Sequence, residues 1–217
     1  MSEFFIFFSA KNKNTLASKK LVYFIVNKPY NVLSQFSAEI SSHKTLKDLY
    51  KFPKDVYPIG RLDKDSEGLL LLSNDRSLNH KLLNPEFKHK RTYHVQIEGL
   101  PNRDALQELR NGIVIRLKQK SYKTMPANIR LLPVPPKVEE RNPPIRYRKE
   151  ITTSWLEMEL QEGKNRQVRR MTAKAGHPTL RLIRVSIEGL ELGSLKIGGI
   201  LQLSKNRVYK ALNIKND

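Results

Sequence analysis

Charged side chains lie directly before an apolar run in residues 60–75, which read GRLDKDSEGLLLLSND. Arg61 and Asp63 are two residues apart, and two further carboxylates follow them. The four leucines at 69–72 are typical of a strand that is buried on both faces. A loop that ends at such a rigid strand is a common position for catalytic groups. We therefore predict Asp63 as the catalytic carboxylate, with an ion pair to Arg61 as its alternative role.

Asp63, Asp65 and Glu67 also resemble the start of a calcium-binding loop, which has acidic residues at alternate positions. The twelfth position of that loop is Asn74, which cannot chelate calcium through two oxygens as glutamate does. A carboxylate pair could also hydrolyse glycosidic bonds, but such pairs flank the scissile bond and usually come from different elements. We expect no metal, and we interpret Asp65 and Glu67 as ordinary loop carboxylates.

No other motif indicates a cofactor. The five histidines show no metal-ligand spacing, and the glycine-rich nucleotide-binding patterns do not occur. The lack of cysteine excludes disulfides, thiolate metal sites and cysteine nucleophiles, and it fits the reducing cytoplasm. We therefore predict a reaction without a cofactor and a cytoplasmic location.

A predicted helix over residues 166–175 has an apolar side and a basic side. The apolar side holds Val168, Met171, Thr172 and Ala175, and the basic side holds Arg166, Arg169, Arg170 and Lys174. Lys164, Arg181 and Arg184 flank this helix. A basic helix face is often only solvated, but the free amides at a helix start also bind anions, and a guanidinium can pair with a catalytic carboxylate. We predict phosphate binding for the group as a whole.

The chain has 40 Lys and Arg against 21 Asp and Glu, which is a formal charge of +19 over 217 residues. This excess predicts a polyanionic partner, with RNA or DNA first and an anionic membrane second. Residues 1–20 contain a short apolar run followed by four lysines. That run is too short to span a bilayer and lacks the flanks of a signal peptide. We expect a mobile basic extension there, and no membrane span elsewhere.

Strand and helix patterns follow one another along the rest of the chain, with no internal repeat and no linker between domains. Alternation and short apolar runs predict strands at residues 21–26, 68–73, 91–98, 113–117, 127–132, 151–161 and 178–187. Caps and apolar periodicity predict helices at residues 45–50, 77–83, 102–110 and 166–175, and after Ser204. Five prolines make residues 133–150 a stiff basic loop. We predict an α+β fold with a mixed, mostly antiparallel sheet flanked by helices and loops.

The segment GRLDKDSEGLLLLSND resembles the catalytic motif of pseudouridine synthases, in the form used by the RsuA-like family. Three other segments resemble the first, tyrosine and third motifs of that family: VNKPYNVL (26–33), RTYHVQ (91–96) and EGKNRQVRRM (162–171). RNPPIR followed by TTSWL, together with PTLRLIR (178–184), is most similar to the RluE branch, which modifies large-subunit ribosomal RNA. The resemblance covers residues 21–190. One small departure is Ser73, where the family motif often has threonine.

The resemblance implies that a uridine in RNA is isomerised to pseudouridine. Asp63 would attack the sugar or the pyrimidine, or would remove a sugar proton. Tyr93 would stack on the flipped base, as aromatic side chains do for splayed nucleotides, with a core tyrosine as the alternative. Arg169 would pair with Asp63 and keep it ionised. Leu180 or Leu182 would line the apolar floor of the pocket.

The same resemblance implies the RNA contacts. Arg61 would fill the gap that the flipped base leaves, and Lys164, Arg166 and Arg170 would contact the RNA. Most relatives carry an S4 RNA-binding domain before the catalytic part, and we expect none here because twenty residues cannot hold one.

We predict residues 21–217 to be the catalytic domain of a monomeric enzyme that acts on 23S ribosomal RNA without an obligate protein partner. A non-catalytic RNA-binding protein with the same fold is the main alternative. An N-glycosidase that stops after bond cleavage is the other.

Overall fold

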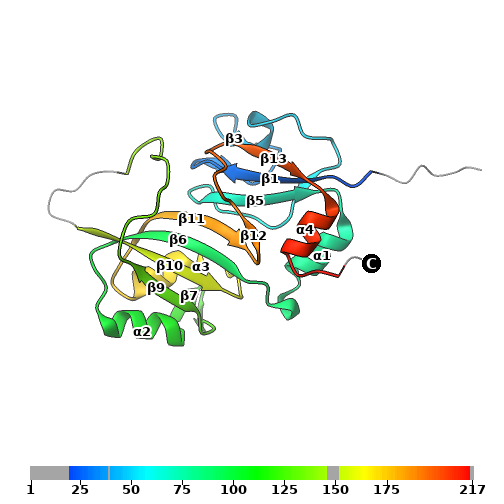
Figure 1. The fold of residues 1–217 in the computed structure, drawn as a ribbon. Coiled ribbons are helices and arrows are strands. Elements are labelled where there is room, and N and C mark those ends of the chain that lie inside the picture. Colours follow the sequence, from blue (N-terminus) through cyan, green and yellow to red (C-terminus); the bar gives the residue numbers. More distant parts are fainter. Residues whose placement is uncertain (1–19, 39, 146–151, 216–217) are drawn as a thin grey trace, which may run out of the picture.

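The computed structural model describes residues 20–38, 40–145 and 152–215 (Figure 1). The expected basic extension at residues 1–20 lies outside this part of the chain except for Lys20, and so do Arg146, Arg148 and Lys149 of the proline-rich segment. The elements follow in the order β1 (Tyr23–Lys28), β2 (Val32–Leu33), β3 (Lys44–Thr45), η1 (Leu46–Asp48), β4 (Tyr57–Pro58), β5 (Glu67–Ser73), α1 (Arg76–Leu83), η2 (Pro85–Phe87), β6 (Arg91–Glu98), α2 (Arg103–Asn111), β7 (Val114–Leu117), β8 (Lys120–Lys123), β9 (Asn128–Leu132), β10 (Thr153–Leu160), α3 (Gln167–Lys174), β11 (Thr179–Ile187), β12 (Leu190–Glu191), β13 (Ile200–Leu203) and α4 (Lys205–Ala211).

One nine-stranded sheet runs through the molecule in the order β13-β1-β5-β11-β6-β10-β9, with β4 and β12 beside it (Figure 1). All of its strand pairs are antiparallel except β5 with β11. The expectation of an α+β fold with a mixed, mostly antiparallel sheet is confirmed.

The two halves of this sheet meet where β5 pairs with β11. Only two residue pairs join these strands, Ile183 with Glu67 and Arg184 with Gly68. Gly68 has a φ of +99°, and a Cβ atom there would lie 2.3 Å from the carbonyl oxygen of Arg184. Only glycine fits such a close approach of two backbones, so this residue fixes how the halves meet.

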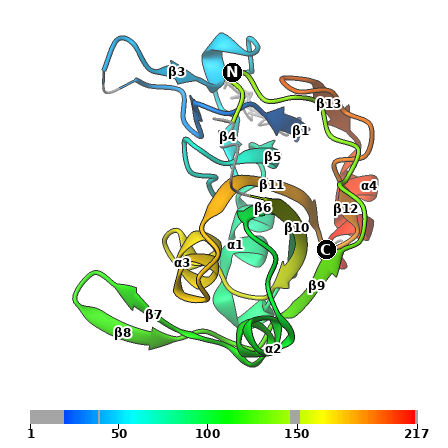
Figure 2. The ribbon, with the colours of Figure 1, turned by 90° about the vertical axis from the view of Figure 1, so that its left-hand side faces the viewer.

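The leucine run in β5 is buried on both faces, as its sequence predicts. Leu69 and Leu71 pack in a cluster with β1, α1 and α4, while Leu70 and Leu72 pack on the opposite face with β1 and η1. The other half of the sheet has its own cluster, in which Val168 of α3 packs on β6, β10 and β11. In Figure 2, α3 lies beside these strands and the β7–β8 hairpin extends away from the body.

Two local predictions are wrong. The helix expected at residues 45–50 is only the single 3-10 turn η1, in which the Asp48 carboxylate accepts from the Thr45 amide and hydroxyl. The strand β8 was not predicted, since its residues are mostly polar and solvent-exposed and show no alternation. It pairs with β7 through a turn in which Lys118 has a φ of +53°.

The proline-rich segment is an irregular strap as far as residue 145. The Arg141 guanidinium stacks on the Tyr30 ring at 4.1 Å from its centroid, and the carbonyl of Glu139 accepts from Arg181 Nη1 at 2.9 Å. These contacts attach the strap to β11 and to the turn after β1. Within the described residues, no helix is both long and apolar enough to cross a membrane.

Asp75 connects three elements of the half of the sheet that contains β1 and β5: the strand β1 and the helices α1 and α4. Its carboxylate accepts from Tyr23 at 2.7 Å, from Tyr209 at 2.6 Å and from the Leu78 amide, and the last of these bonds caps α1. Burial alone would raise the pKa of Asp75, but the tyrosine and amide hydrogen bonds outweigh it and lower the pKa.

We expect Asp75→Ala to lower the free energy of unfolding by about 3 kcal/mol, because a helix cap is lost and two buried hydroxyls lose their acceptor. The lowered pKa gives a stabilisation that is complete above the unfolded pKa of about 3.9 and is lost as pH falls through the folded pKa. Urea unfolding at pH 7 and at pH 3 should therefore show a smaller difference between wild type and variant at pH 3. An equal difference at both pH values would contradict this role.

Candidate active site

A cavity of about 640 Å³ lies between the loop before β5, the strands β6 and β11, and the loop before α3. Six of the predicted site residues line it, namely Arg61, Asp63, Tyr93, Lys164, Arg166 and Leu182. They come from four separate stretches of sequence, so the fold brings together what the motifs leave apart. Its rim is basic, and Asp63 presents a partly exposed carboxylate to it.

The turn after β1 holds the backbone of the Asp63 loop. The Asp63 carbonyl accepts from the Ser66 amide at 3.0 Å, which closes a tight turn. Ser34 Oγ donates to the Leu62 carbonyl at 2.8 Å and accepts from the Leu62 amide at 3.1 Å. The Asn31 amide donates to the Lys64 carbonyl of the loop at 2.8 Å. These bonds fix the backbone on both sides of Asp63.

Lys28 supports the same turn from inside the protein. The side chain is fully buried, and Nζ donates to the carbonyls of Pro29, Val32 and Lys64 at 2.8, 2.7 and 3.4 Å. Burial lowers the pKa of Lys28 to about 7, against the attraction of Glu67 and the other nearby carboxylates. Sequence reasoning missed this residue, because a lysine that ends an apolar strand is usually exposed.

Two arginines from the α3 region, Arg166 and Arg169, contact Asp65. Arg166 donates to both of its carboxylate oxygens at 2.9 and 2.8 Å. Arg169 donates to its carbonyl at 2.7 Å and lies 3.4 Å from Oδ2. Burial opposes ionisation of Asp65, but the Arg166 hydrogen bonds and the charge of Arg169 lower its pKa. The arginines therefore hold the loop on its α3 side as well.

The ion pair to Asp63 comes from Arg166, whose Nη1 lies 3.5 Å from Asp63 Oδ2. Arg166 has a φ of +52°, a costly conformation for a residue other than glycine and one that often occurs at functional sites. Arg169, which was expected to pair with Asp63, makes its contacts with Asp65 instead. Arg166 precedes the helix and reaches both Asp63 and Asp65, while the more buried Arg169 reaches only Asp65 of the two carboxylates.

The remaining predicted cations lie elsewhere. Arg170 donates to the Arg116 carbonyl at 2.7 Å and lines a separate hollow beside β7. Arg181 and Arg184 are buried, with exposed fractions of 5% and 4%. Arg181 is occupied by an ion pair, and Arg184 donates to the Leu69 carbonyl. These two arginines are therefore not available to a phosphate, because both guanidinium groups are buried against protein partners, one on each face of the sheet.

Tyr93 and Leu182 form part of the cavity wall from adjacent strands. Tyr93 is half-buried and packs against both of the clusters that meet there. Leu182 is 6% exposed and belongs to the cluster under α3. An aromatic ring that is supported from below and open above is suited to stacking with a base.

Glu162 was missed although it organises the loop before α3. It accepts from the Tyr122 hydroxyl, from the Met125 amide at 2.8 Å and from Gln167 Nε2 at 2.6 Å. Gln167 Oε1 in turn accepts from the Lys164 amide at 2.9 Å. The loop that carries Lys164 and Arg166 is thus tied to β8, a contact that no local pattern reveals.

Glu67 is not a loop carboxylate, as was expected, but begins β5. It is 2% exposed and pairs with Arg181 through both oxygens, at 2.8 and 2.7 Å. Asp65 is likewise not a solvated loop carboxylate, since Arg166 donates to both of its oxygens. Glu67 therefore pairs with Arg181, whereas Asp63 and Asp65 both lie beside Arg166, so the three carboxylates contact cations of the protein.

The sequence and the fold place this protein among the enzymes that make pseudouridine in RNA. The chain belongs to the RNA pseudouridylate synthase family, whose model matches residues 22–174. Two similar proteins are named ribosomal large subunit pseudouridine synthase E. The protein from Xanthomonas axonopodis pv. citri is 47% identical over 171 residues, which is 79% of this chain and 88% of that protein. The protein from Vibrio vulnificus is 45% identical over 195 residues, or 90% of this chain and 80% of that protein.

Solved structures show the same fold. A crystal structure of a pseudouridylate synthase superposes with a TM-score of 0.72 at 23% identity, covering 89% of this chain and 74% of that one. The human RNA pseudouridylate synthase domain containing 1 superposes with a TM-score of 0.51 at 12% identity and covers 90% of this chain and 93% of that one.

Proposed function

We propose that this protein isomerises a uridine to pseudouridine in 23S ribosomal RNA, with Asp63 as the catalytic carboxylate. The observation that carries the proposal is the position of Asp63, on a fixed loop in the same cavity as Tyr93 and Leu182. The names of the similar proteins support the large ribosomal subunit as the source of the substrate. The reaction is redox-neutral and the base is kept, so it needs no group transferred from a cofactor.

The chemistry breaks the bond from ribose C1′ to N1, turns the base, and forms a bond from C1′ to C5. The C5 proton leaves and N1 gains a proton, so the atoms balance within an isomerisation. The target base must first leave its helix, which costs a few kcal/mol. Asp63 then either attacks the sugar or the pyrimidine, or removes a sugar proton. Arg166 Nη1 lies 3.5 Å from Asp63 Oδ2 and places a positive charge beside the reacting carboxylate.

The other residues of the cavity hold the RNA in this proposal. Tyr93 stacks on the flipped base and Leu182 limits the space beneath it. Arg61 is exposed at the mouth, where its Nη2 lies 3.5 Å from Gln35 Oε1, and it can enter the gap in the RNA helix. Lys164 and Arg166 line the same cavity, where they can contact phosphates.

The decisive experiment maps pseudouridines in 23S ribosomal RNA from cells with and without this protein. Loss of one site on deletion, and its return with the wild-type gene, is the expected result. An unchanged map together with RNA binding by the purified protein would favour the non-catalytic RNA-binding alternative. Release of free uracil from the RNA in vitro would favour an N-glycosidase.

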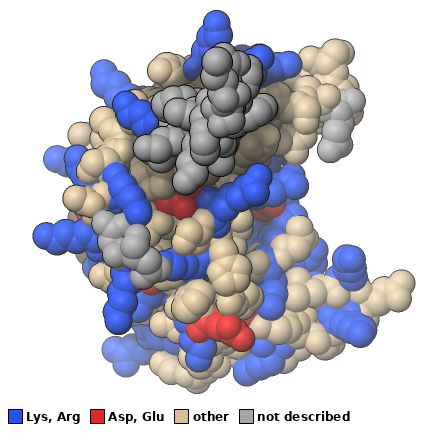
Figure 3. All heavy atoms as spheres, turned by 90° about the vertical axis from the view of Figure 1, so that its right-hand side faces the viewer, with Lys and Arg blue, Asp and Glu red and all other residues tan. Residues whose placement is uncertain are grey.

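RNA affinity should fall steeply as salt increases. The charge of +19 and the wide spread of Lys and Arg over the face shown in Figure 3 predict several phosphate contacts. Each contact releases counterions, so a plot of log affinity against log salt should be linear with a negative slope of about 0.7 to 0.9 per contact. Filter binding from 50 to about 300 mM salt measures this slope, and a flat response would remove phosphate contacts from the proposal.

We also propose that residues 21–217 act as the catalytic domain of a cytoplasmic monomer with no obligate protein partner. The continuous sheet from β13 to β9 supports a single working unit. Sedimentation of the purified protein tests the monomeric state. An assay without added proteins tests whether a protein partner is required.

A further inference from the structure

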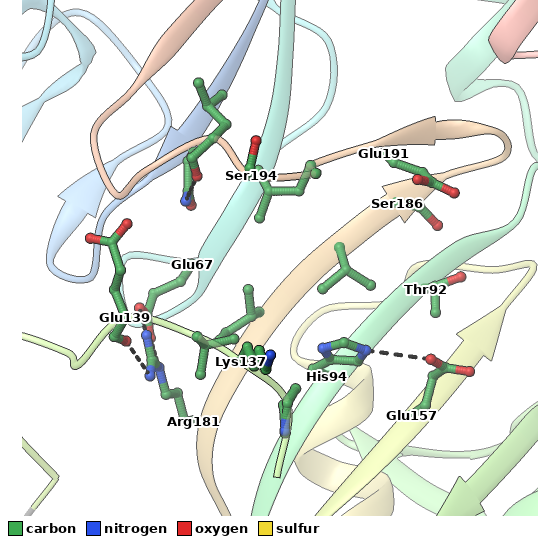
Figure 4. A pocket seen from close by; sticks show the side chains of 18 of the residues that line it. Glu67, Thr92, His94, Lys137, Glu139, Glu157, Arg181, Ser186, Glu191 and Ser194 are labelled. Carbon is green, nitrogen blue, oxygen red and sulfur yellow. Dashed lines mark hydrogen bonds and ion pairs between the residues drawn. The ribbon is translucent and has the colours of Figure 1, made fainter. Parts of the chain in front are cut away.

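A buried ion pair lies behind the catalytic loop and has no part in the mechanism above. Arg181 Nε and Nη2 donate to Glu67 Oε2 and Oε1 at 2.8 and 2.7 Å, and the two side chains are 6% and 3% exposed. The third nitrogen, Nη1, donates to the Glu139 carbonyl of the strap. Figure 4 shows the pair beneath Glu139, at one end of a pocket.

This pocket is on the opposite face of the sheet from Asp63. Its volume is about 540 Å³, and Glu67 and Arg181 line it. Leu182, the next residue of β11, lines the active-site cavity instead. The pair therefore cannot touch a substrate bound beside Asp63.

The pair does lie at the junction between the two halves of the sheet. Glu67 and Ile183 form one of the only two residue pairs that join β5 to β11, and Arg181 is two residues before Ile183. Asp63 comes from the β5 side of this junction, whereas Tyr93 and Leu182 come from the β6 and β11 side. The Glu67–Arg181 pair thus bridges the two parts that must be in register for the reaction.

Alternate residues of the loop are held in different directions. Asp63 faces the cavity, Asp65 is held by Arg166 and Arg169 on the α3 side, and Glu67 is held by Arg181 on the back. The arginine contacts to Asp65 on one side and to Glu67 on the other leave the loop little freedom, and we refer to these contacts as clamps. A shift of about 1 Å in a reacting group can cost about 100-fold in rate, so the accuracy of these clamps affects the chemistry.

Burial of an ion pair is a poor way to gain stability alone. The loss of hydration offsets much of the attraction, and apolar residues of similar volume often stabilise a protein equally well. A bidentate pair does, however, fix distance and orientation, which apolar contacts do not.

We propose that Glu67 and Arg181 are positioning residues, which fix Asp63 relative to Tyr93 and Leu182 by joining β5 to β11. This inference rests on the proposed function.

The test uses Glu67→Gln, Arg181→Gln and the double variant Glu67→Leu/Arg181→Met. The apolar double variant keeps the site filled, so it is expected to fold even if a single variant does not. We expect all three to lower the single-turnover rate of pseudouridine formation by about 10- to 100-fold. The dissociation constant for the RNA should stay within about twofold, because no residue of the cavity changes. The double variant should be no slower than the slower single variant, because residues that act as a unit are not additive.

The matched control is the ion pair between Arg130 and Glu157 of the same sheet, with a distance of 2.7 Å. It joins β9 to β10, away from the β5–β11 junction. Arg130→Gln/Glu157→Gln should keep the wild-type rate. Equal slowing of this control would show a general effect of charge loss and would overturn the proposal.

Two further results would also overturn it: a folded Glu67→Leu/Arg181→Met variant with the wild-type rate, or a rate loss that follows only the unfolded fraction at the assay temperature. A wild-type protein that makes no pseudouridine contradicts the proposed function instead. An active wild type beside an unaffected double variant contradicts only the positioning role.

Discussion

Asp63→Asn is expected to abolish pseudouridine formation while the protein still binds RNA. Asparagine has nearly the same shape, so the loop bonds through Ser34 and Ser66, which use backbone atoms of the loop, should remain. The amide can neither attack a carbon nor accept a proton as a carboxylate does. Loss of a group that reacts directly lowers rates by about 10⁴-fold or more. Single-turnover assays with labelled RNA measure the rate, and filter binding measures the affinity.

The matched control for this substitution is Asp104→Asn. Asp104 is exposed in the first turn of α2 and does not line the cavity, so the change in charge is the same without the change in chemistry. Its rate should equal that of the wild type. If Asp63→Asn keeps more than about one hundredth of the wild-type rate, a direct chemical role for this carboxylate is refuted.

Asp65→Asn should give the second largest effect, although this residue does no chemistry in the proposal. Asparagine cannot accept two charge-assisted hydrogen bonds, so Arg166 loses its bidentate partner and Arg169 loses a compensating charge in a half-closed site. We expect the rate to fall about 10- to 100-fold, since Asp63 and the arginines then lose their fixed geometry.

The conservative variant Asp65→Glu separates charge from shape. It keeps the carboxylate on a longer side chain and should recover part of the rate that Asp65→Asn loses. RNA affinity and thermal unfolding, measured on the same samples, exclude loss of binding or of fold as the cause. A wild-type rate for Asp65→Asn would show that the arginines need no anchor on the loop.

Local patterns were sufficient for most of the elements that carry the site. The leucines of β5 are buried on both faces, Asp75 and Asn102 cap α1 and α2, and Gly112 ends α2 at a φ of +85°. These features depend on residues that are close in the sequence and on the helix or strand period, and both can be read from the sequence. The strand β8 was missed, because its polar residues show no alternation and its support comes from the distant Glu162, which accepts from Tyr122.

The partners of the charged residues could not be predicted. Arg169 and Arg170 are adjacent on the basic face of α3, yet one is mostly buried against Asp65 and the other holds the carbonyl of residue 116. Helical periodicity gives the side of the helix but not what lies across from it. Glu67 and Arg181 are 114 residues apart, and nothing local marks them as a pair.

The sequence alone therefore determined the family resemblance, the catalytic candidate at Asp63 and the buried strand that supports it, because these depend on residue identities at short spacing. Only the tertiary structure decided that Arg166 faces Asp63, that Arg166 and Arg169 hold Asp65, and that Arg181 pairs with Glu67 on the back of the sheet. The physical reason is that an ion pair depends on distance in space. That distance is set by the way β5 and β11 meet at Gly68, and these two strands are far apart in the sequence.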